Sequence, residues 1–345
     1  MQKGPEYTDN IFFEELHLRH INLLIDLKNN KNNSWFYKMA IINTFDDIKS
    51  FLINLDKIKT KCIIAILKKK IIGYLFTYPI NQNKTCIKIN TPNFIDDNYT
   101  STKRSLTLEL IKKSISNTDL KTSSWIINSE VTNLELISCS RELGFQPLQE
   151  IKLLSRSKKI NQTHKCSTDF PKLENFVQIN KTNIQKVLNF VRSNESILTR
   201  NIFDFNQKDI SQRNDKFCGS ICFDNEIIFT VLKDINYLDE KVYSFTRGPL
   251  WDSRITSILL MFLEKNFFNN PGILLKINSE DKRLYEFLTD LGFLELRSEL
   301  ILVRNNLIKR EFKASNKINN SLESILDKIN PQGNPYPSPF PICKN

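Results

Sequence analysis

Residues 127–145 read INSEVTNLELISCSRELGF, and residues 277–293 read INSEDKRLYEFLTDLGF. In both stretches the same four residues lead through a short amphipathic segment to the triplet Leu-Gly-Phe. A shared tetrapeptide arises easily in a chain rich in Ile, Asn, Ser and Lys, but a shared order and spacing does not. The two stretches therefore indicate a duplicated unit, and they mark the same strand end and final helix in each copy.

A true duplication predicts further matches at an offset that changes slowly along the chain. The pair Ile71-Ile72 and the pair Ile227-Ile228 each follow a short polar turn, and they stand 156 residues apart. The helical runs that begin at Ser105 and Ser257 are 152 apart, the INSE phrases 150 and the Leu-Gly-Phe triplets 148. This smooth drift predicts two copies of one domain.

The chain of 345 residues has room for two domains that each bury a core of their own. We assign residues 10–155 to the first copy and 173–308 to the second. Residues 156–172, which are mostly polar, are interpreted as a linker. Residues 309–345 are interpreted as a short helix and a Pro-rich tail, for which extended polyproline geometry is expected.

Composition narrows the class of protein. The net charge of +11 is spread along the chain rather than clustered, so we expect a solvated basic surface and not a nucleic-acid partner. The seven cysteines are scattered and odd in number, which favours a reducing compartment over a disulfide framework and gives no metal site. The N-terminus lacks a signal-peptide pattern and no apolar run suffices to cross a membrane, so a cytoplasmic protein is expected.

Hydrophobic periodicity gives the first copy the order β, α, α, β, β, β, α, β, α, β, and the second copy runs in the same order with one helix identified between its first two strands. In the first copy the expected strands are 11–13, 62–67, 71–78, 85–90, 124–128 and 145–154, and the helices begin near 21, 45, 105 and 134. In the second copy the strands are 176–179, 218–223, 227–233, 242–245, 273–277 and 293–303, with helices at 184–191, 255–268 and 282–291.

This order, with a last helix that ends at Leu-Gly-Phe, resembles the GNAT superfamily of acyl-CoA-dependent N-acyltransferases, here as a tandem pair. In that family a Gly-Phe ends the last helix and starts the next strand, and Gly144-Phe145 and Gly292-Phe293 match it. Glycine suits the left-handed position after a helix, and the aromatic residue enters the core. The resemblance implies an α/β (α+β) chain of two GNAT-like folds, each with a mixed central sheet flanked by helices.

The resemblance also implies acetyl-CoA or another acyl-CoA as co-substrate, held by a loop at a helix N-terminus where backbone N–H groups meet the pyrophosphate. The family's glycine-rich pattern is missing from both corresponding windows. Small hydroxyls and cations remain there, in positions where they equally suit ordinary helix caps. The candidate cofactor-binding residues are Ser101, Thr102, Lys103 and Arg104 in the first copy, and Trp251, Asp252, Ser253 and Arg254 in the second.

Amide formation from a thioester needs a general base and an acid. Asn133 stands eleven residues before Gly144, as an Asn does in the family, and is a further candidate for cofactor binding. The family's tyrosine acid is replaced by Ser140 and Leu288. Glu130 and Glu280 follow a central strand where the family's cleft opens, so they are the candidate bases, although each also suits a cap of the following helix.

Two functions stay open from the sequence. One is an acyl-CoA-dependent N-acetyltransferase acting on an unidentified amine, either a small molecule or a protein. The other is a non-catalytic tandem of the same fold that binds a ligand or a protein through degenerate CoA loops.

Overall fold

The computed structural model describes residues 11–20, 22–23, 60–95, 103–119, 121–156, 176–223, 226–237, 240–249, 251, 253–268, 270 and 272–306, with only the backbone of Phe223, Ser253 and Arg254. These residues belong to one compact unit, Met1–Asn306. The expected tail lies outside the described residues, as does the expected linker apart from Arg156, which is the last residue of a strand. The helix near residue 45 and most of the helix near residue 21 lie outside them too.

Within its described residues the first copy supplies six main strands, a short strand, a 3-10 turn and two helices. In chain order these are β1 (Phe12–Glu15), η1 (Leu18–His20), β2 (Lys61–Leu67), β3 (Lys70–Pro79), β4 (Cys86–Ile89), β5 (Asn93–Phe94), α3 (Lys103–Ser116), β6 (Ser124–Glu130), α4 (Leu134–Glu142) and β7 (Gln146–Arg156).

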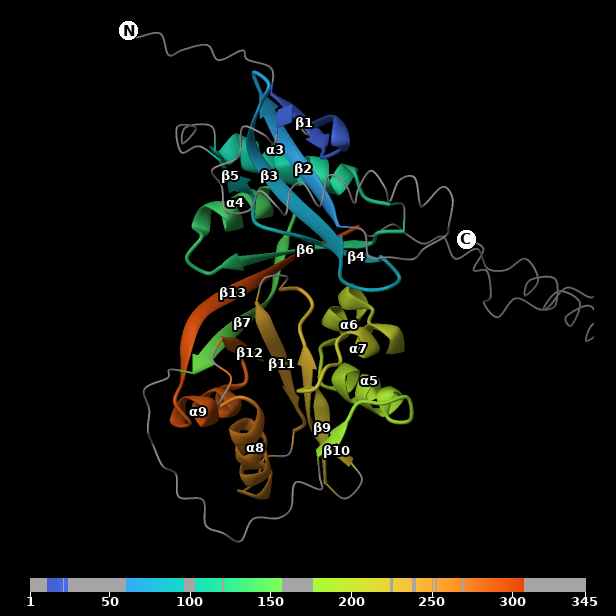
Figure 1. Ribbon diagram of the computed structural model, residues 1–345, viewed down its shortest axis with the longest axis vertical. Coiled ribbons are helices and arrows are strands. Elements are labelled where there is room, and N and C mark those ends of the chain that lie inside the picture. Colours follow the sequence, from blue (N-terminus) through green and yellow to red (C-terminus); the bar gives the residue numbers. More distant parts are fainter. Residues whose placement is uncertain are drawn as a thin grey trace, which may run out of the picture. The chain divides into compact units, whose positions relative to one another are not determined.

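The second copy has the same order of elements. Here the helices between the first two strands lie within the described residues. Its elements are β8 (Phe176–Gln178), α5 (Ile184–Ser193), α6 (Ile197–Phe203), α7 (Gln207–Gln212), β9 (Gly219–Phe223), β10 (Glu226–Lys233), β11 (Lys241–Arg247), α8 (Ser253–Asn266), β12 (Ile273–Asn278), α9 (Lys282–Asp290) and β13 (Phe293–Asn305). Helices α5 to α7 and helices α8 and α9 lie on opposite sides of these strands (Figure 1).

A single mixed sheet runs through both copies. Among the described residues it has 13 strands, in the order β1-β2-β3-β4-β6-β13-β7-β12-β11-β10-β9-β8, with β5 paired to β3 beside this path. The pairs β4 with β6 and β11 with β12 are parallel, and their neighbours are antiparallel. The mixed α/β class expected from the sequence is confirmed, but the two expected sheets are joined into one.

The join is a reciprocal exchange of the last strands. Strand β13 of the second copy pairs with β6 of the first, and β7 of the first copy pairs with β12 of the second. Between them β7 and β13 pair antiparallel along most of their length, and they run side by side through the centre of the molecule (Figure 1). Each copy therefore completes its sheet with a strand from the other copy.

Side chains follow the same exchange. Leu302 of β13 is fully buried in a core cluster formed otherwise by first-copy residues, among them Ile127, Leu110 and Phe145. Leu154, its counterpart on β7, is fully buried in the large cluster that holds the second-copy core. The hydrophobic stabilisation of each copy thus includes burial of a leucine from the other.

The repeated Leu-Gly-Phe triplet has the role that its glycine suggested. Gly144 and Gly292 have φ of 84° and 82°, a conformation that side chains with a Cβ disfavour. After α4, the N–H of Gly144 donates to Arg141 O and that of Phe145 to Ser140 O, the two bonds of a Schellman motif. The turn ends the helix and directs Phe145, which is fully buried, into the core.

Most expected elements in the described ranges are found, with ends that differ by a few residues. The expectation omitted α6, α7 and the short β5. Helix α7 has six residues, too few for hydrophobic periodicity to identify. The exchange of β7 and β13 was not expected either, because a sequence pattern defines a strand but not its neighbour.

Replacing Leu302 with Ala tests the exchange. We expect the free energy of unfolding to fall by about 2 to 5 kcal/mol, because a fully buried leucine leaves a cavity. Native-state hydrogen exchange should accelerate in β4, β6 and α3 of the first copy. Leu294→Ala on the same strand is the control, and since Leu294 is 56% exposed it should change stability by less than about 0.5 kcal/mol. If hydrogen exchange accelerates only in β11 and β12, the result contradicts the proposed packing of β13 into the first copy.

Candidate functional site

The parallel strands β11 and β12 part after four paired residues. Their pairing runs from Lys241 with Ile273 to Ser244 with Lys276. Beyond this point β11 continues to Arg247 as a partner of β10, and β12 continues to Asn278 as a partner of β7. Within the part of the chain that the structure describes, the inner edges of the two strand ends therefore have no strand partner, and they face each other across a gap.

A cavity of about 530 Å³ opens at this gap, and we call it the second cleft. Its floor comes from the parted strand ends, one wall from the α5–α6 turn and α6, and another from β7. The volume is in the range that holds a small ligand. Its lining includes Ile151, Val191, Glu195, Ser196, Phe203, Phe205, Arg213, Leu232, Asn236, Ser244, Phe245, Thr246, Arg247, Lys276, Ile277, Asn278, Glu280 and Asp281.

Glu195 is a half-buried acid of this cleft whose carboxylate has no partner among the described residues. It lies in the turn between α5 and α6, directly before Ser196, whose Oγ caps α6 by accepting a hydrogen bond from Thr199 N at 3.1 Å. The Glu195 carboxylate makes no hydrogen bond or ion pair with the described residues. Burial raises the pKa of this carboxyl, and the positive charges of Arg213 and Lys276 oppose the increase only in part. A half-buried carboxyl of this kind is suited to take up a proton.

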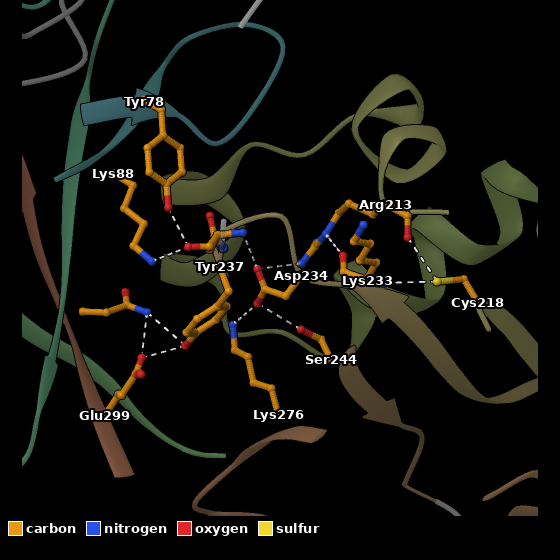
Figure 2. A network of polar contacts seen from close by, with 12 residues as sticks. Tyr78, Lys88, Arg213, Cys218, Lys233, Asp234, Tyr237, Ser244, Lys276 and Glu299 are labelled. Carbon is orange, nitrogen blue, oxygen red and sulfur yellow. Dashed lines mark hydrogen bonds and ion pairs between the residues drawn. The ribbon is translucent and has the colours of Figure 1, made fainter. Parts of the chain in front are cut away.

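Two cations and one buried acid form the inner end of the cleft (Figure 2). Lys276 Nζ donates to Asp234 Oδ2 at 2.6 Å, and Ser244 Oγ donates to the same oxygen at 3.2 Å. Arg213 Nη2 is 4.0 Å from Asp234 Oδ1, which also accepts from Asn236 N at 2.9 Å. Burial acts to raise the pKa of Asp234, but Lys276 and Arg213 outweigh it, and the pKa lies below its usual range.

The mouth of the second cleft is closed on one side by an ion pair. Arg247 Nε donates to both oxygens of Asp281, at 2.8 and 2.7 Å. Asp281 Oδ1 also accepts from Leu284 N at 3.2 Å and so caps α9. This contact fixes the end of β11 to the start of α9 across the gap.

The first copy has a corresponding opening, which we call the first cleft. Strands β4 and β6 pair from Cys86 with Ser124 to Ile89 with Ile127, after which β6 continues to Glu130 beside β13. A cavity of about 390 Å³ lies there. It is lined by Lys88, Asn90, Thr91, Asn93, Asn128, Asn236, Tyr237, Glu240, Arg297 and Glu299.

A polar network spans the first cleft. Tyr237 comes from the β10–β11 connection of the second copy, and its hydroxyl donates to Glu299 Oε2 at 2.6 Å (Figure 2). Asn128 Nδ2 donates to that carboxylate at 3.1 Å, and Arg297 Nε donates to Glu299 Oε1 at 2.8 Å. Hydrogen bonds from Tyr237 and Arg297 outweigh burial and lower the pKa of Glu299. In the second cleft the residue opposite Asn278, the repeat counterpart of Asn128, is Ile151, as Ile301 is opposite Asn128.

Lys88 is the unusual cation of the first cleft. It is 5% exposed, and its Nζ donates to Asn236 O at 2.6 Å and lies 4.7 Å from the ring centroid of Tyr237. Burial lowers the pKa of Lys88 to about 8, although Asp234 and Glu299 oppose the decrease. Its ammonium has no carboxylate within ion-pair distance among the described residues.

The candidate bases from the sequence lie in different surroundings. Glu280 is exposed and lines the second cleft, whereas Glu130 is exposed at the end of β6 and lines neither cleft. Their alternative role as helix caps is wrong. The caps are Asn133, whose Oδ1 accepts from Leu136 N at 3.1 Å, and Asp281. Asn133, the candidate cofactor residue, is thus already engaged through its carbonyl oxygen.

The candidate CoA residues are described only in part. Ser101, Thr102 and Asp252 lie outside the described residues, and Ser253 and Arg254 form the first turn of α8. Arg104 Nη2 donates to Glu142 at 2.7 Å, and Lys103 Nζ lies 5.5 Å from the Phe94 ring centroid. Trp251 packs edge-on against Phe287 with the ring centroids 5.6 Å apart, and Arg247 lies over its ring.

The sequence did not single out Glu195, Arg213 or Lys276. Glu195 lies in an ordinary polar turn, and Arg213 and Lys276 are two positions in a chain of 49 basic residues. Only Lys276 carried a signal, as a charged residue within an apolar strand. Ser140 and Leu288, at the position of the family's tyrosine, are both fully buried and supply no acid there.

No known protein family and no curated protein sequence matches the chain. Solved structures similar to it include a putative acetyltransferase from Pyrococcus horikoshii, at 12% identity and a TM-score of 0.47, covering 90% of this chain and 95% of that one. Another is a tandem GNAT protein from the clavulanic acid biosynthesis pathway, at 8% identity and a TM-score of 0.48, covering 86% and 98%. A third is a GCN5-related N-acetyltransferase from Sphaerobacter thermophilus, at 8% and 0.45, covering 86% and 95%. Because the sequence identities and TM-scores are low, the function is inferred from the residues of the two clefts.

The described residues contain no group of three or more His, Cys, Asp or Glu side chains placed to hold a metal ion. In the same part of the chain no helix is long and apolar enough to cross a membrane.

Replacing Lys88 with Met tests the buried cation. Below pH 8 the lysine is charged in both the native and the unfolded state, so the native state bears the full cost of burial. Between about 8 and its ordinary value of 10.5 the unfolded state binds more protons, and stability rises with pH. We expect Lys88→Met to raise the free energy of unfolding by about 2 kcal/mol at pH 7, a gain that shrinks toward pH 10.5.

Urea unfolding at several pH values measures this difference. The matched control is Lys70→Met, which removes an exposed lysine of β3. A constant difference between Lys88→Met and the parent protein from pH 7 to 10.5 contradicts a lowered pKa for Lys88.

Proposed function

We propose that the protein is an acyl-CoA-dependent N-acyltransferase and that the second cleft is its active site. The observation that carries this proposal is the parting of β11 and β12 at a cavity lined by Glu195, whose carboxylate has no partner among the described residues. Acetyl-CoA is the proposed donor and an amine the proposed acceptor.

The parted strands supply a place for the donor. An extended chain with amide groups adds readily to an unpaired strand edge, because its hydrogen bonds replace those of a strand. The arm of CoA has two amides in such a chain, and the inner edge of residues 245–247 has no strand partner. The arm lying there brings the thioester to the floor of the second cleft.

The diphosphate end of the donor belongs at the start of α8, directly after β11. Backbone N–H groups and the helix dipole favour an anion at such a position. Trp251, Asp252, Ser253 and Arg254 are the proposed contacts, with Arg254 supplying charge in place of the family's glycines.

Glu195 is the proposed general base, in place of Glu280 and Glu130. Its carboxylate takes a proton from the acceptor's ammonium, and the free amine attacks the thioester carbon. A C–N bond forms, the C–S bond breaks, and the proton that the new amide nitrogen sheds goes to the leaving thiolate. Glu280 is exposed where it lines the cleft, and it takes no part in the proposed proton transfer.

The first copy is proposed to act as a structural partner. Its cleft is spanned by Tyr237, Glu299 and Asn128, and its predicted CoA residue Arg104 is paired with Glu142. Its contribution to the active site is β7, which forms one wall of the second cleft.

A cytoplasmic location is part of the proposal. The cysteines in the described ranges, namely Cys62, Cys86, Cys139, Cys218 and Cys222, are all free thiols, as a reducing compartment maintains them.

Glu195→Gln tests the base. Acetyl-CoA should bind the variant as it binds the parent, while CoA release with a panel of amines should slow by about 10²- to 10⁴-fold. In the parent, kcat/KM should fall as pH falls through the raised pKa of Glu195, because only the carboxylate accepts a proton. Calorimetry measures binding, and a thiol-reactive dye measures CoA release.

Glu286→Gln is the matched control, since Glu286 is an exposed acid of α9 that lines neither cleft. Absence of acetyl-CoA binding at millimolar concentration overturns the enzyme proposal. Binding without transfer to any amine instead identifies the non-catalytic alternative.

Arg254→Glu and Lys103→Glu tell which copy holds the donor. We expect Arg254→Glu to weaken acetyl-CoA binding by about 10-fold, because it replaces attraction of the diphosphate by repulsion. Lys103→Glu should leave the Kd unchanged. Weakening by Lys103→Glu alone would place the donor in the first copy.

A further inference from the structure

Besides Glu195, the second cleft is lined by a nearly buried cation, Arg213, and this cation indicates a class of acceptor. Building on the function proposed above, we propose that the acceptor is a small zwitterion, an amine that also carries a carboxylate, and that Arg213 binds this carboxylate. Apolar amino acids are the simplest members of the class.

Arg213 is held in place from its backbone and from the root of its guanidinium. It follows α7, and its carbonyl accepts from Lys233 N at 3.0 Å while its Nε donates to Lys233 O at 3.2 Å. The guanidinium carbon lies 4.6 Å from the ring centroid of Phe205. Both contacts orient the planar group and leave its two terminal nitrogens directed away from the backbone.

Those terminal nitrogens have no hydrogen-bond acceptor among the described residues. The nearest acid, Asp234, is 4.0 Å from Nη2, too far for a hydrogen bond. The side chain is only 6% exposed, and it lines the second cleft. A nearly buried guanidinium with two free nitrogens offers the fork geometry that a carboxylate matches with two parallel hydrogen bonds.

Asp234 does not fill this role itself. Its Oδ2 accepts from Lys276 and Ser244, and its Oδ1 accepts from the Asn236 backbone. One carboxylate thus faces two cations, Lys276 and Arg213, and is bonded to the first. Asp234 thus balances part of the charge of Arg213 from 4.0 Å, whereas the hydrogen bonds of the terminal nitrogens are left for a bound anion.

Glu195 supplies the opposite end of the recognition. It lies on the α5–α6 wall and lines the same cavity, yet it is farther than ion-pair distance from both Arg213 and Lys276. A negative and a positive group thus face one cavity without meeting. A molecule with an ammonium and a carboxylate pairs with both, and its net charge of zero adds no unpaired charge to the cleft.

The remaining lining indicates the rest of the acceptor. Between the charged groups the cleft is walled by Val191, Phe203, Phe205, Leu232 and Phe245. An apolar side chain of the acceptor buries its surface against them, and a polar one leaves its groups unpaired.

Matched acceptors test the inference on the intact protein. L-Phenylalanine and 2-phenylethylamine differ only in the carboxylate, as do L-leucine and 3-methylbutylamine. With acetyl-CoA as donor, we expect kcat/KM for the amino acid to exceed that for its amine by about 100-fold in at least one pair, because two charge-assisted hydrogen bonds are at stake. Arg213→Lys should reduce this ratio at least tenfold, because a lysine cannot form the two parallel hydrogen bonds.

Arg200→Lys is the control, because Arg200 is exposed on α6 and does not line the cleft, and it should leave the ratio unchanged. Should Arg213→Lys fail to fold, the ratios in the parent protein still decide. The inference is overturned when neither pair favours the amino acid, including when neither amino acid accepts an acetyl group. Acetyl-CoA binding, measured separately by calorimetry, distinguishes this outcome from a failure of the proposed function.

Discussion

The antiparallel pairing of β7 with β13 is the contact on which both clefts depend. Each of these strands continues into the sheet of the other copy, so that β7 supports β12 and β13 supports β6. A parallel pair of strands parts cleanly only where each strand has another neighbour to follow. The exchanged strands are these neighbours, and they hold β12 and β6 away from β11 and β4 at the points where the cavities open.

The two clefts have the same framework but different chemistry, and the segment from Asp234 to Tyr237 lies between them. Asp234 faces Lys276 and Arg213 on one side, and Tyr237 reaches Glu299 on the other (Figure 2). Asn236 lines both cavities, and its carbonyl accepts from Lys88. Among the described residues, the second cleft thus holds an acid without a partner, Glu195, whereas the charged groups of the first cleft mostly pair with one another.

The sequence predicted the framework far better than the site. The Leu-Gly-Phe turns, the strand before each and the order of elements follow from local rules, because glycine conformation and hydrophobic periodicity act over a few residues. The exchange depends on pairing between residues about 150 positions apart, which no local pattern specifies. The sequence did not predict Glu195 and Arg213 for the same reason. They are candidates because, in the folded chain, the Glu195 carboxylate and the terminal nitrogens of Arg213 lack hydrogen-bond partners among the described residues. Glu130 was chosen for its place in the repeat, and the structure puts it at a surface away from both cavities.

The strand exchange also determines when the first copy can complete its sheet during translation. Strand β6 ends at Glu130, but the neighbour that covers its edge ends at Asn305, so the first half waits for nearly the whole second half to be translated. At ordinary rates of translation this delay lasts about 10 to 30 s. During that interval the nascent chain presents an open apolar strand edge, the kind of surface that chaperones bind and that pairs with other chains. The ribosome, rather than the folded protein, is where this architecture is most exposed to aggregation.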